Sequence, residues 1–214
     1  MRGTVVLDVG ETLVDETRQW AAWARWLEVP EFTLYGVLGG LAALGRDHRE
    51  FVGLLRPGAD FETERAAKEA AGQGWAALEA VDLYPDALPC LRQLRAEGWR
   101  TVVGGNQPAA FQQLVVRLDL PVDLVTSSGA LGVEKPAPAF YRAVAALAGV
   151  PTHECVHVGD RVDNDLLGAR AAGMAVVHVR RGPWGVLHAE QALREGLPRV
   201  ASLDELPAVL RILR

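Results

Sequence analysis

The chain has 214 residues, half of them hydrophobic, and carries 22 Lys and Arg against 27 Asp and Glu, a formal charge of −5. This length allows one α/β domain with a small insertion. The mild negative charge argues against a nucleic-acid-binding protein, which normally presents a basic face. No apolar stretch reaches the roughly 18 residues of a membrane span, and no signal peptide is predicted. The two distant cysteines, Cys90 and Cys155, fit a reducing compartment, so we expect a cytoplasmic protein.

The chain opens with an apolar, β-branched run at residues 4–9, which predicts a strand buried on both faces. The next segment, about 15–82, is rich in Ala, Leu, Glu, Arg and Trp and predicts three or four helices. Within it, Trp20, Trp23 and Trp26 recur every three residues and form one apolar helix stripe. This stripe favours a core role, with contact to a substrate as the alternative for Trp20 or Trp23.

From about residue 83 onward, predicted helices and strands alternate. The predicted strands are 100–103, 122–126, 155–158, 175–179 and a short one near Val200. The predicted helices are 85–97, 108–118, 138–148, 164–172 and 203–213. Such alternation implies right-handed crossovers and an α/β fold with a mostly parallel sheet.

Polar residues follow several of these strands directly, namely Asp8, Asn106, Ser127 and Asp160. Because ligands bind beyond the carboxyl ends of parallel strands, we expect these side chains to converge. A carboxylate such as Asp8 at the end of a buried strand needs a compensating partner or a metal. Asp8 is interpreted either as a nucleophile that forms an aspartyl-phosphate or as the cap of the next turn.

Three acids, Asp160, Asp163 and Asp165, lie within six residues on a predicted strand-to-helix turn. Carboxylates are preferred ligands of Mg²⁺. Asp160 and Asp165 are therefore interpreted as metal or network residues, and Asp163 or Asn164 as the helix N-cap. Lys135, in a loop stiffened by nearby prolines, could neutralise a phosphate and the Asp8 charge, although most loop lysines are simply solvated.

These residues resemble the motifs of the haloacid dehalogenase-like superfamily, chiefly its phosphatase branch. That family has an apolar strand ending D-x-D-G-T, a second strand ending in Thr or Ser and often Asn, a loop Lys often followed by Pro, and G-D-x-x-x-x-D. The corresponding stretches occur here in the same order: Asp8–Thr12, Gly105–Asn106, Lys135–Pro136 and Gly159–Asp165. The resemblance covers essentially the whole chain. It implies a Rossmann-like, mostly parallel sheet flanked by helices, built from residues 1–14 and 83–214, with 15–82 as an inserted all-helical cap.

The resemblance also implies an activity, a Mg²⁺-dependent hydrolysis of a small soluble phosphate ester by a monomer or homodimer. Asp8 is then the catalytic nucleophile, and Lys135 holds the phosphate charge. The implied phosphate-binding residues are Gly105, Asn106 and Lys135. The implied metal ligands are Asp8, Asp160, Asp165 and the backbone carbonyl of Gly10, with Asp165 also positioning Lys135 or a metal-bound water.

Two positions depart from the family pattern. Gly10 stands where the phosphatases have a second Asp that acts as general acid and base, and losing such a group costs about 10² to 10⁴ in rate. Glu11 could substitute for it, although neighbouring side chains of an extended segment point in opposite directions. Gly105 stands where the family has a hydroxyl, so only backbone N–H groups remain there. Both changes predict slow turnover.

Other functions stay open. A degenerate member of the family would bind a metabolite or a protein partner without turnover. A metal-free dehalogenase is weaker, because that branch has Ser at the position of Asp160. The phosphonate-cleaving branch needs a cap lysine, and Lys68, the lysine of the helical segment, is expected to be exposed. Contact with an anionic substrate is a minority interpretation for Arg18, Arg25 and Arg46.

Overall fold

The computed structural model describes residues 2–74, 78–109 and 111–213, which form two compact units. One unit comprises Met1–Val14 and Leu83–Arg214, and the other Asp15–Asp82. The predicted helical segment 15–82 includes residues 75–77, and the predicted helix 108–118 includes Ala110. These residues lie outside the described ranges. No helix among the described residues is long and apolar enough to cross a membrane.

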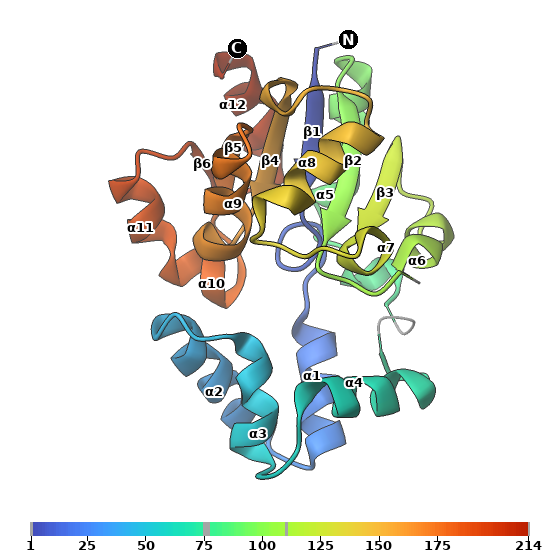
Figure 1. The fold of residues 1–214 in the computed structure, drawn as a ribbon, viewed down its shortest axis with the longest axis vertical. Helices are drawn as coiled ribbons and strands as arrows, with labels where there is room; N and C mark the ends of the chain where they lie inside the picture. Colours follow the sequence, from blue (N-terminus) through green and yellow to red (C-terminus); the bar gives the residue numbers. More distant parts are fainter. Residues whose placement is uncertain (1, 75–77, 110, 214) are drawn as a thin grey trace. The chain divides into compact units, whose positions relative to one another are not determined.

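The first unit contains a six-stranded sheet in which every neighbouring pair is parallel. The strands stand in the order β3-β2-β1-β4-β5-β6. They are Thr4–Leu7 (β1), Arg100–Gly105 (β2), Leu124–Ser127 (β3), Cys155–Gly159 (β4), Ala175–Val179 (β5) and Arg199–Val200 (β6). The predicted parallel α/β fold is confirmed, and β1 lies near the centre of the sheet (Figure 1).

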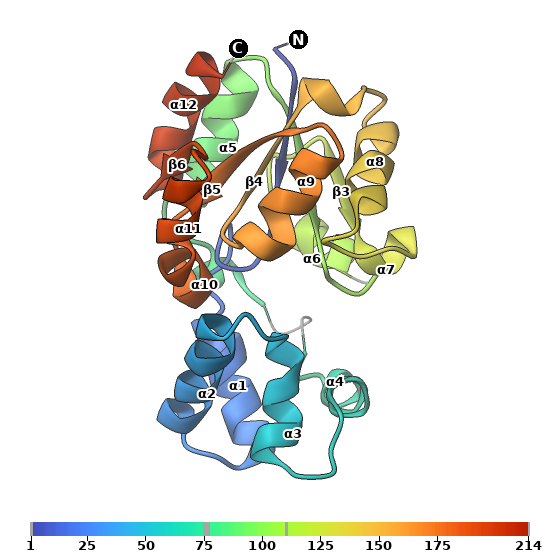
Figure 2. The same ribbon diagram turned by 60° about the vertical axis from the view of Figure 1, so that its left-hand side comes forward.

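Helices cover both faces of this sheet, with α8 and α9 on one face and α5 and α12 on the other (Figures 1 and 2). The α-helices of this unit are Ala87–Ala96 (α5), Phe111–Arg117 (α6), Ser128–Leu131 (α7), Pro138–Leu147 (α8), Leu167–Ala171 (α9), Gly182–Leu187 (α10), Ala189–Arg194 (α11) and Leu206–Ile212 (α12). The sequence did not predict α7, α10 and α11, which are only four to six residues long. Such short helices carry too little hydrophobic periodicity to be recognised.

Two element ends differ from prediction in ways that affect the site. Strand β2 continues through Gly104 and Gly105 because both glycines pair with β3. The helix predicted at 164–172 begins instead with a π-helical turn, Val162–Leu166, and only then becomes α9. In that turn the N–H groups of Asp165 and Leu166 share the carbonyl of Arg161, at 2.8 and 3.3 Å. π-Turns often occur at functional sites.

The core under α8 and α9 fixes the position of β1. Val6 and Val102, on adjacent strands, pack with Phe140, Tyr141 and Val144 of α8 in one buried cluster. All four residues of β1 are buried, as the continuous apolar run predicts for a central parallel strand. The residue that follows β1 therefore leaves the sheet from a rigid position.

The second unit, in the part that the structure describes, contains the α-helices Thr17–Leu27 (α1), Glu31–Ala43 (α2), Phe51–Leu55 (α3) and Phe61–Ala70 (α4). Its tryptophan stripe packs inside the unit. Trp23 is buried, stacks on Phe61 with ring centroids 5.6 Å apart, and meets Phe51 edge-on at 5.2 Å. The predicted core role is therefore correct for Trp23.

The expectation that Lys68 is exposed is wrong. Its side chain is buried, its Nζ donates to the carbonyl of Gln73, and it lies 5.3 Å from the ring centroid of Trp23. The aliphatic part of a lysine side chain can cover apolar surface while its ammonium group donates a hydrogen bond to a carbonyl. The acidic composition of α4 gives no sign of such packing. Burial lowers the pKa of Lys68 below its usual value.

Candidate active site

The carboxyl edge of the sheet brings together most of the residues that the sequence singled out. Asp8 follows β1, Asn106 follows β2, and Asp160 follows β4. The backbone N–H of Asp8 donates to the carbonyl of Val158 at 2.9 Å, which continues the β1–β4 ladder by one residue. The side chains of Asp8 and Asp160 are both buried at this edge. Ser127, by contrast, donates its hydroxyl to the carbonyl of Pro108 at 3.2 Å.

Lys135 joins this edge as a buried cation between two carboxylates. Its Nζ lies 2.5 Å from Asp8 Oδ1 and 2.6 Å from Asp165 Oδ1. Burial lowers the pKa of Lys135, but the negative charges of Asp165 and Asp8 outweigh burial and hold this pKa above its usual value. The sequence-based idea of a solvated loop lysine therefore does not apply.

Asn106 holds the Lys135 loop in place. Its Oδ1 accepts from the backbone N–H of Lys135 at 2.8 Å, and its Nδ2 donates to the carbonyl of Lys135 at 3.0 Å. This bidentate contact to the backbone fixes the origin of the lysine side chain. Both ends of the Asn106 amide are thus hydrogen-bonded to Lys135. This arrangement gives no direct support to the predicted contact between the Asn106 side chain and a phosphate.

Asp165 uses both carboxylate oxygens. Oδ1 meets Lys135, and Oδ2 accepts from the backbone N–H of Arg161 at 3.0 Å, across the π-helical turn. Burial raises the pKa of Asp165, but the charge of Lys135 and the neighbouring His157 outweigh it and leave the pKa well below its usual value. Asp165 is therefore held as an anion that orients Lys135.

Asp160 is the carboxylate whose charge is compensated least. Among the described residues it has no hydrogen-bond or ion-pair partner for its carboxylate. Burial raises its pKa well above the usual value, and the charges of Asp165, Asp8 and Glu11 raise it further, while Arg161 offsets only part. A buried carboxylate beside other acids stays ionised only if a cation is supplied.

The acidic cluster fits a divalent cation. One carboxylate oxygen each from Asp8, Asp160 and Asp165 lies within 4.8 Å of the others, and all three residues are buried. Lys135 is the one lysine that contacts this cluster in the described residues, so the cluster keeps a net negative charge. Oxygen ligands with excess negative charge are what Mg²⁺ requires.

Gly10 and Glu11 occupy the turn after Asp8. The backbone of Glu11 is left-handed, with φ of 51°, a conformation that costs about 1 kcal/mol or more for a residue with a side chain. Its Oε2 accepts from the Tyr84 hydroxyl at 2.6 Å. The Arg181 guanidinium lies 4.2 Å from the Tyr84 ring centroid and donates to the carbonyl of Thr12 at 3.0 Å. The Glu11 carboxylate is therefore held in a network.

Gly105 lies close to two polar side chains. A Cβ at this position would lie 2.7 Å from Asp8 Oδ1 and 2.6 Å from Gln107 Oε1. Real Cβ atoms do not approach other atoms this closely, so a larger residue at position 105 would require the ends of the Asp8 and Gln107 side chains to move. Sequence reasoning missed Gln107, although it lies two residues past Gly105 at the same sheet edge, where polar residues were the signal.

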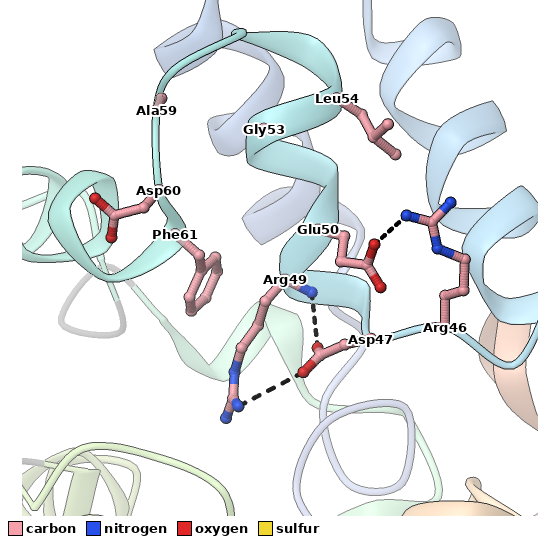
Figure 3. A pocket seen from close by; sticks show the side chains of 9 residues that line it. All are labelled: Arg46, Asp47, Arg49, Glu50, Gly53, Leu54, Ala59, Asp60 and Phe61. Atoms are coloured by element: carbon pink, nitrogen blue, oxygen red, sulfur yellow. Dashed lines mark hydrogen bonds and ion pairs between the residues drawn. The ribbon is translucent and has the colours of Figure 1, made fainter.

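The second unit has a surface cavity of about 450 Å³ (Figure 3). Its arginines are matched by acids, since Arg46 pairs with Glu50, and Arg49 lies 3.7 Å from Asp47. The lining residues are Arg46, Asp47, Arg49, Glu50, Gly53, Leu54, Ala59, Asp60 and Phe61. Elsewhere in this unit, the Arg18 guanidinium lies 2.7 Å from the Asp82 carboxylate, and the Arg25 guanidinium lies 3.5 Å from the Glu31 carboxylate. These pairings give no support to an anion site.

Residues 3–173 match the family model of haloacid dehalogenase-like hydrolases, which is most of the chain. The chain belongs to the haloacid dehalogenase-like hydrolase family. The sheet-edge cluster of Asp8, Lys135, Asp160 and Asp165 is thus the candidate active site of a family member. Strand β5 and the segments beyond it lie outside the matched range, and they contribute none of these four residues.

Two curated relatives show what kinds of protein the chain is similar to. A glyceraldehyde 3-phosphate phosphatase of Methanopyrus kandleri is 36% identical over 146 residues, which is 65% of this chain and 62% of the relative. A phosphoserine phosphatase of Thermus thermophilus is 35% identical over 103 residues, 47% of this chain and 41% of the relative. The chain therefore spans less than two thirds of either relative.

Solved structures show the same fold. A β-phosphoglucomutase of Clostridium difficile superposes with a TM-score of 0.69 over 100% of both chains, at 15% sequence identity. At this level of identity the similarity concerns the fold alone, and it includes the whole of this chain.

We expect Mg²⁺ to stabilise the protein against heat, because it compensates the Asp160 carboxylate. At a concentration 100 times the dissociation constant, binding adds about 2.7 kcal/mol, or roughly 5–10 °C in a protein of this size. Asp160→Asn should lose most of this gain, while Asp163→Asn, in the same turn but exposed, should keep it. Differential scanning fluorimetry with MgCl₂ and with EDTA measures the effect. An equal Mg²⁺ shift in wild type and Asp160→Asn would contradict the site.

Proposed function

We propose that this protein is a Mg²⁺-dependent phosphatase that hydrolyses small soluble phosphate esters through an aspartyl-phosphate on Asp8. The observation that carries the proposal is the buried triad in which Lys135 joins Asp8 and Asp165, with the incompletely compensated Asp160 beside it. Phosphoryl transfer needs a positioned nucleophile and a concentration of positive charge. The relatives named as phosphatases support this choice of substrate class.

Each residue has a distinct part in this proposal. A carboxylate oxygen of Asp8 attacks phosphorus while the bond from phosphorus to the ester oxygen breaks, and the alcohol leaves with a proton. Water then cleaves the aspartyl-phosphate to return the Asp8 carboxylate and release inorganic phosphate. Lys135 balances the phosphoryl charge throughout, and Asp165 keeps the ammonium aimed at Asp8.

The metal would be held by Asp8, Asp160 and the backbone carbonyl of Gly10, with Asp165 completing the acidic cluster. When bound, Mg²⁺ supplies charge that draws the phosphoryl group to the Asp8 carboxylate and neutralises its oxygens. Asp165 has both oxygens hydrogen-bonded in this structure, so its contribution is assigned chiefly to Lys135. Asn106 supports the same lysine from the backbone side.

The step that lacks a residue is proton transfer to the leaving group. Gly10 offers no carboxylate, and the Glu11 carboxylate accepts a hydrogen bond from Tyr84. The departing oxygen must therefore take its proton from water, which is slow for alkoxides and unimportant for acidic leaving groups. We infer slow turnover of alkyl phosphates and a preference for esters of acidic alcohols or phenols.

The helical unit 15–82 is proposed as a cap that selects the substrate, and the unit formed by 1–14 and 83–214 as the catalytic core. A cap excludes water and favours small soluble substrates. The relatives act, by their names, on glyceraldehyde 3-phosphate and phosphoserine, so a phosphorylated metabolite of similar size is the proposed substrate class.

A second candidate function is a family member that binds a phosphorylated metabolite or a protein partner without turnover. The observation that favours it is the turn at Gly10 and Glu11, where no free carboxylate is available for proton transfer. The metal-free dehalogenase is not favoured, because Asp160 is a buried acid at the position where that branch has Ser.

Replacing the nucleophile tests the proposal. With Mg²⁺ and a panel of phosphate esters, Asp8→Asn should reduce phosphate release by at least about 10³-fold, because the amide cannot attack phosphorus. The control Asp204→Asn removes an exposed carboxylate of the same unit and should release phosphate at the wild-type rate. Release that survives Asp8→Asn unchanged would refute the nucleophile. No release by wild type would favour the binding function.

Restoring the acid tests the explanation for slow turnover. Gly10 has a φ outside the left-handed region, so Gly10→Asp is compatible with its backbone. We expect a rate gain of about 10² to 10⁴ for an alkyl phosphate such as glycerol phosphate. The burst of p-nitrophenolate from p-nitrophenyl phosphate should rise much less, because that leaving group needs no proton. Phosphate release should rise for both esters, because a carboxylate at position 10 can also activate the water that cleaves the aspartyl-phosphate. Stopped-flow release of p-nitrophenolate and initial rates of phosphate release measure the two steps, and no gain in phosphate release would show that proton transfer is not limiting.

A further inference from the structure

Gln107 has a buried polar atom whose hydrogen bond is missing. The side chain is 7% exposed, and its Oε1 has no hydrogen-bond partner among the described residues. Native structures rarely keep such an atom, since burial removes water without supplying a replacement. A group that the Gln107 amide contacts during function would explain the unpartnered oxygen.

The Gln107 amide is aimed at the nucleophile. A Cβ built on Gly105 would lie 2.6 Å from Gln107 Oε1, 3.0 Å from Gln107 Nε2 and 2.7 Å from Asp8 Oδ1. The end of the amide and the attacking carboxylate therefore flank the same small volume. Asp8 Oδ1 is also the oxygen that Lys135 contacts, so the same carboxylate oxygen meets Lys135 Nζ and faces the volume beside the Gln107 amide.

The backbone around Gln107 is fixed, which makes this placement a property of the fold. The carbonyl of Gln107 accepts from Gly129 N at 3.1 Å and from the Ser128 hydroxyl at 3.3 Å, both in α7. Its own N–H donates to the carbonyl of Gly105 at 3.0 Å. Gly129 allows this contact, because a Cβ there would lie 2.6 Å from Ala109 N.

The site needs the donor that an amide can offer. An ammonium has three N–H donors, and Lys135 already directs two of them at Asp8 and Asp165. One donor remains for a phosphoryl group that carries charge on three oxygens. Gly105, next to Asp8, has no side chain to add another.

We propose that the Gln107 side-chain amide donates to a phosphoryl oxygen held beside Asp8. Rotation of the amide exchanges its two ends, so Nε2–H can take the place that the unpartnered Oε1 has in this structure. The contact is neutral and adds orientation to the charge that Lys135 supplies. This assignment rests on the proposed phosphatase function, because it names a binding residue for that substrate class.

The test compares Gln107→Leu, which keeps the bulk and removes the hydrogen bond, with Gln107→Glu, which keeps the shape and adds a negative charge. Gln113→Ala, an exposed glutamine on α6, is the control. Binding of inorganic phosphate in the presence of Mg²⁺ is measured by isothermal titration calorimetry, and kcat and KM with p-nitrophenyl phosphate by initial rates. Thermal unfolding without phosphate is recorded for each variant.

We expect Gln107→Leu to weaken phosphate binding about 10- to 100-fold, the range for one hydrogen bond to a charged group, and Gln107→Glu to weaken it more. The unfolding temperature of Gln107→Leu should not fall, because this substitution removes an unpartnered buried atom. A purely structural glutamine would show the reverse, a lower unfolding temperature with unchanged phosphate affinity, and that result overturns the assignment.

The two proposals fail in distinguishable ways. If wild type binds phosphate and shows turnover that depends on Asp8, but Gln107→Leu matches wild type in both, only the Gln107 assignment is overturned. If wild type neither binds phosphate nor shows such turnover, the proposed function and the assignment fall together.

Discussion

The central physical constraint in this protein is the burial of several carboxylates around a single lysine at the carboxyl edge of the sheet. Asp8, Asp160 and Asp165 are all buried there, and Lys135 contacts two of them. Ion pairs of this kind repay their desolvation only with good geometry and further hydrogen bonds. The surrounding elements supply both, since Asn106 anchors Lys135 and the π-helical turn anchors Asp165. Asp160 is compensated only in part, by Arg161, which is why the site suits a metal.

The fold serves this constraint. The central strand β1 is fully buried and is packed in the core beneath α8. Asp8, which follows β1, is therefore held in a fixed position at the edge of the sheet. The acid/base side is built differently, because Gly10 contributes only backbone and Glu11 is held by Tyr84 in a strained conformation. The result is a site equipped to hold and attack a phosphoryl group but poorly equipped to protonate what leaves.

The sequence predicted the parallel α/β fold and the edge that collects Asp8, Asn106 and Asp160, because strand ends and topology are encoded locally by apolar runs and turns. It could not predict that Lys68 is buried, because composition does not show which neighbours cover an acidic helix. It also missed Gln107, whose proposed role depends on how closely its amide approaches Gly105 and on a contact to α7, both of which are tertiary. The sequence therefore locates the site, but the roles of individual residues within it depend on tertiary contacts that only the structure shows.

The central claim is that Asp8 carries the phosphoryl group, and the missing acid/base predicts that this adduct persists. Protein mixed with Mg²⁺ and p-nitrophenyl phosphate, then quenched in acid and digested, can be mapped by mass spectrometry. We predict a phosphoryl group on the peptide that contains Asp8, in a substantial fraction of wild-type molecules and in none of the Asp8→Asn molecules. Turnover without any adduct, or an adduct on another residue, would contradict it.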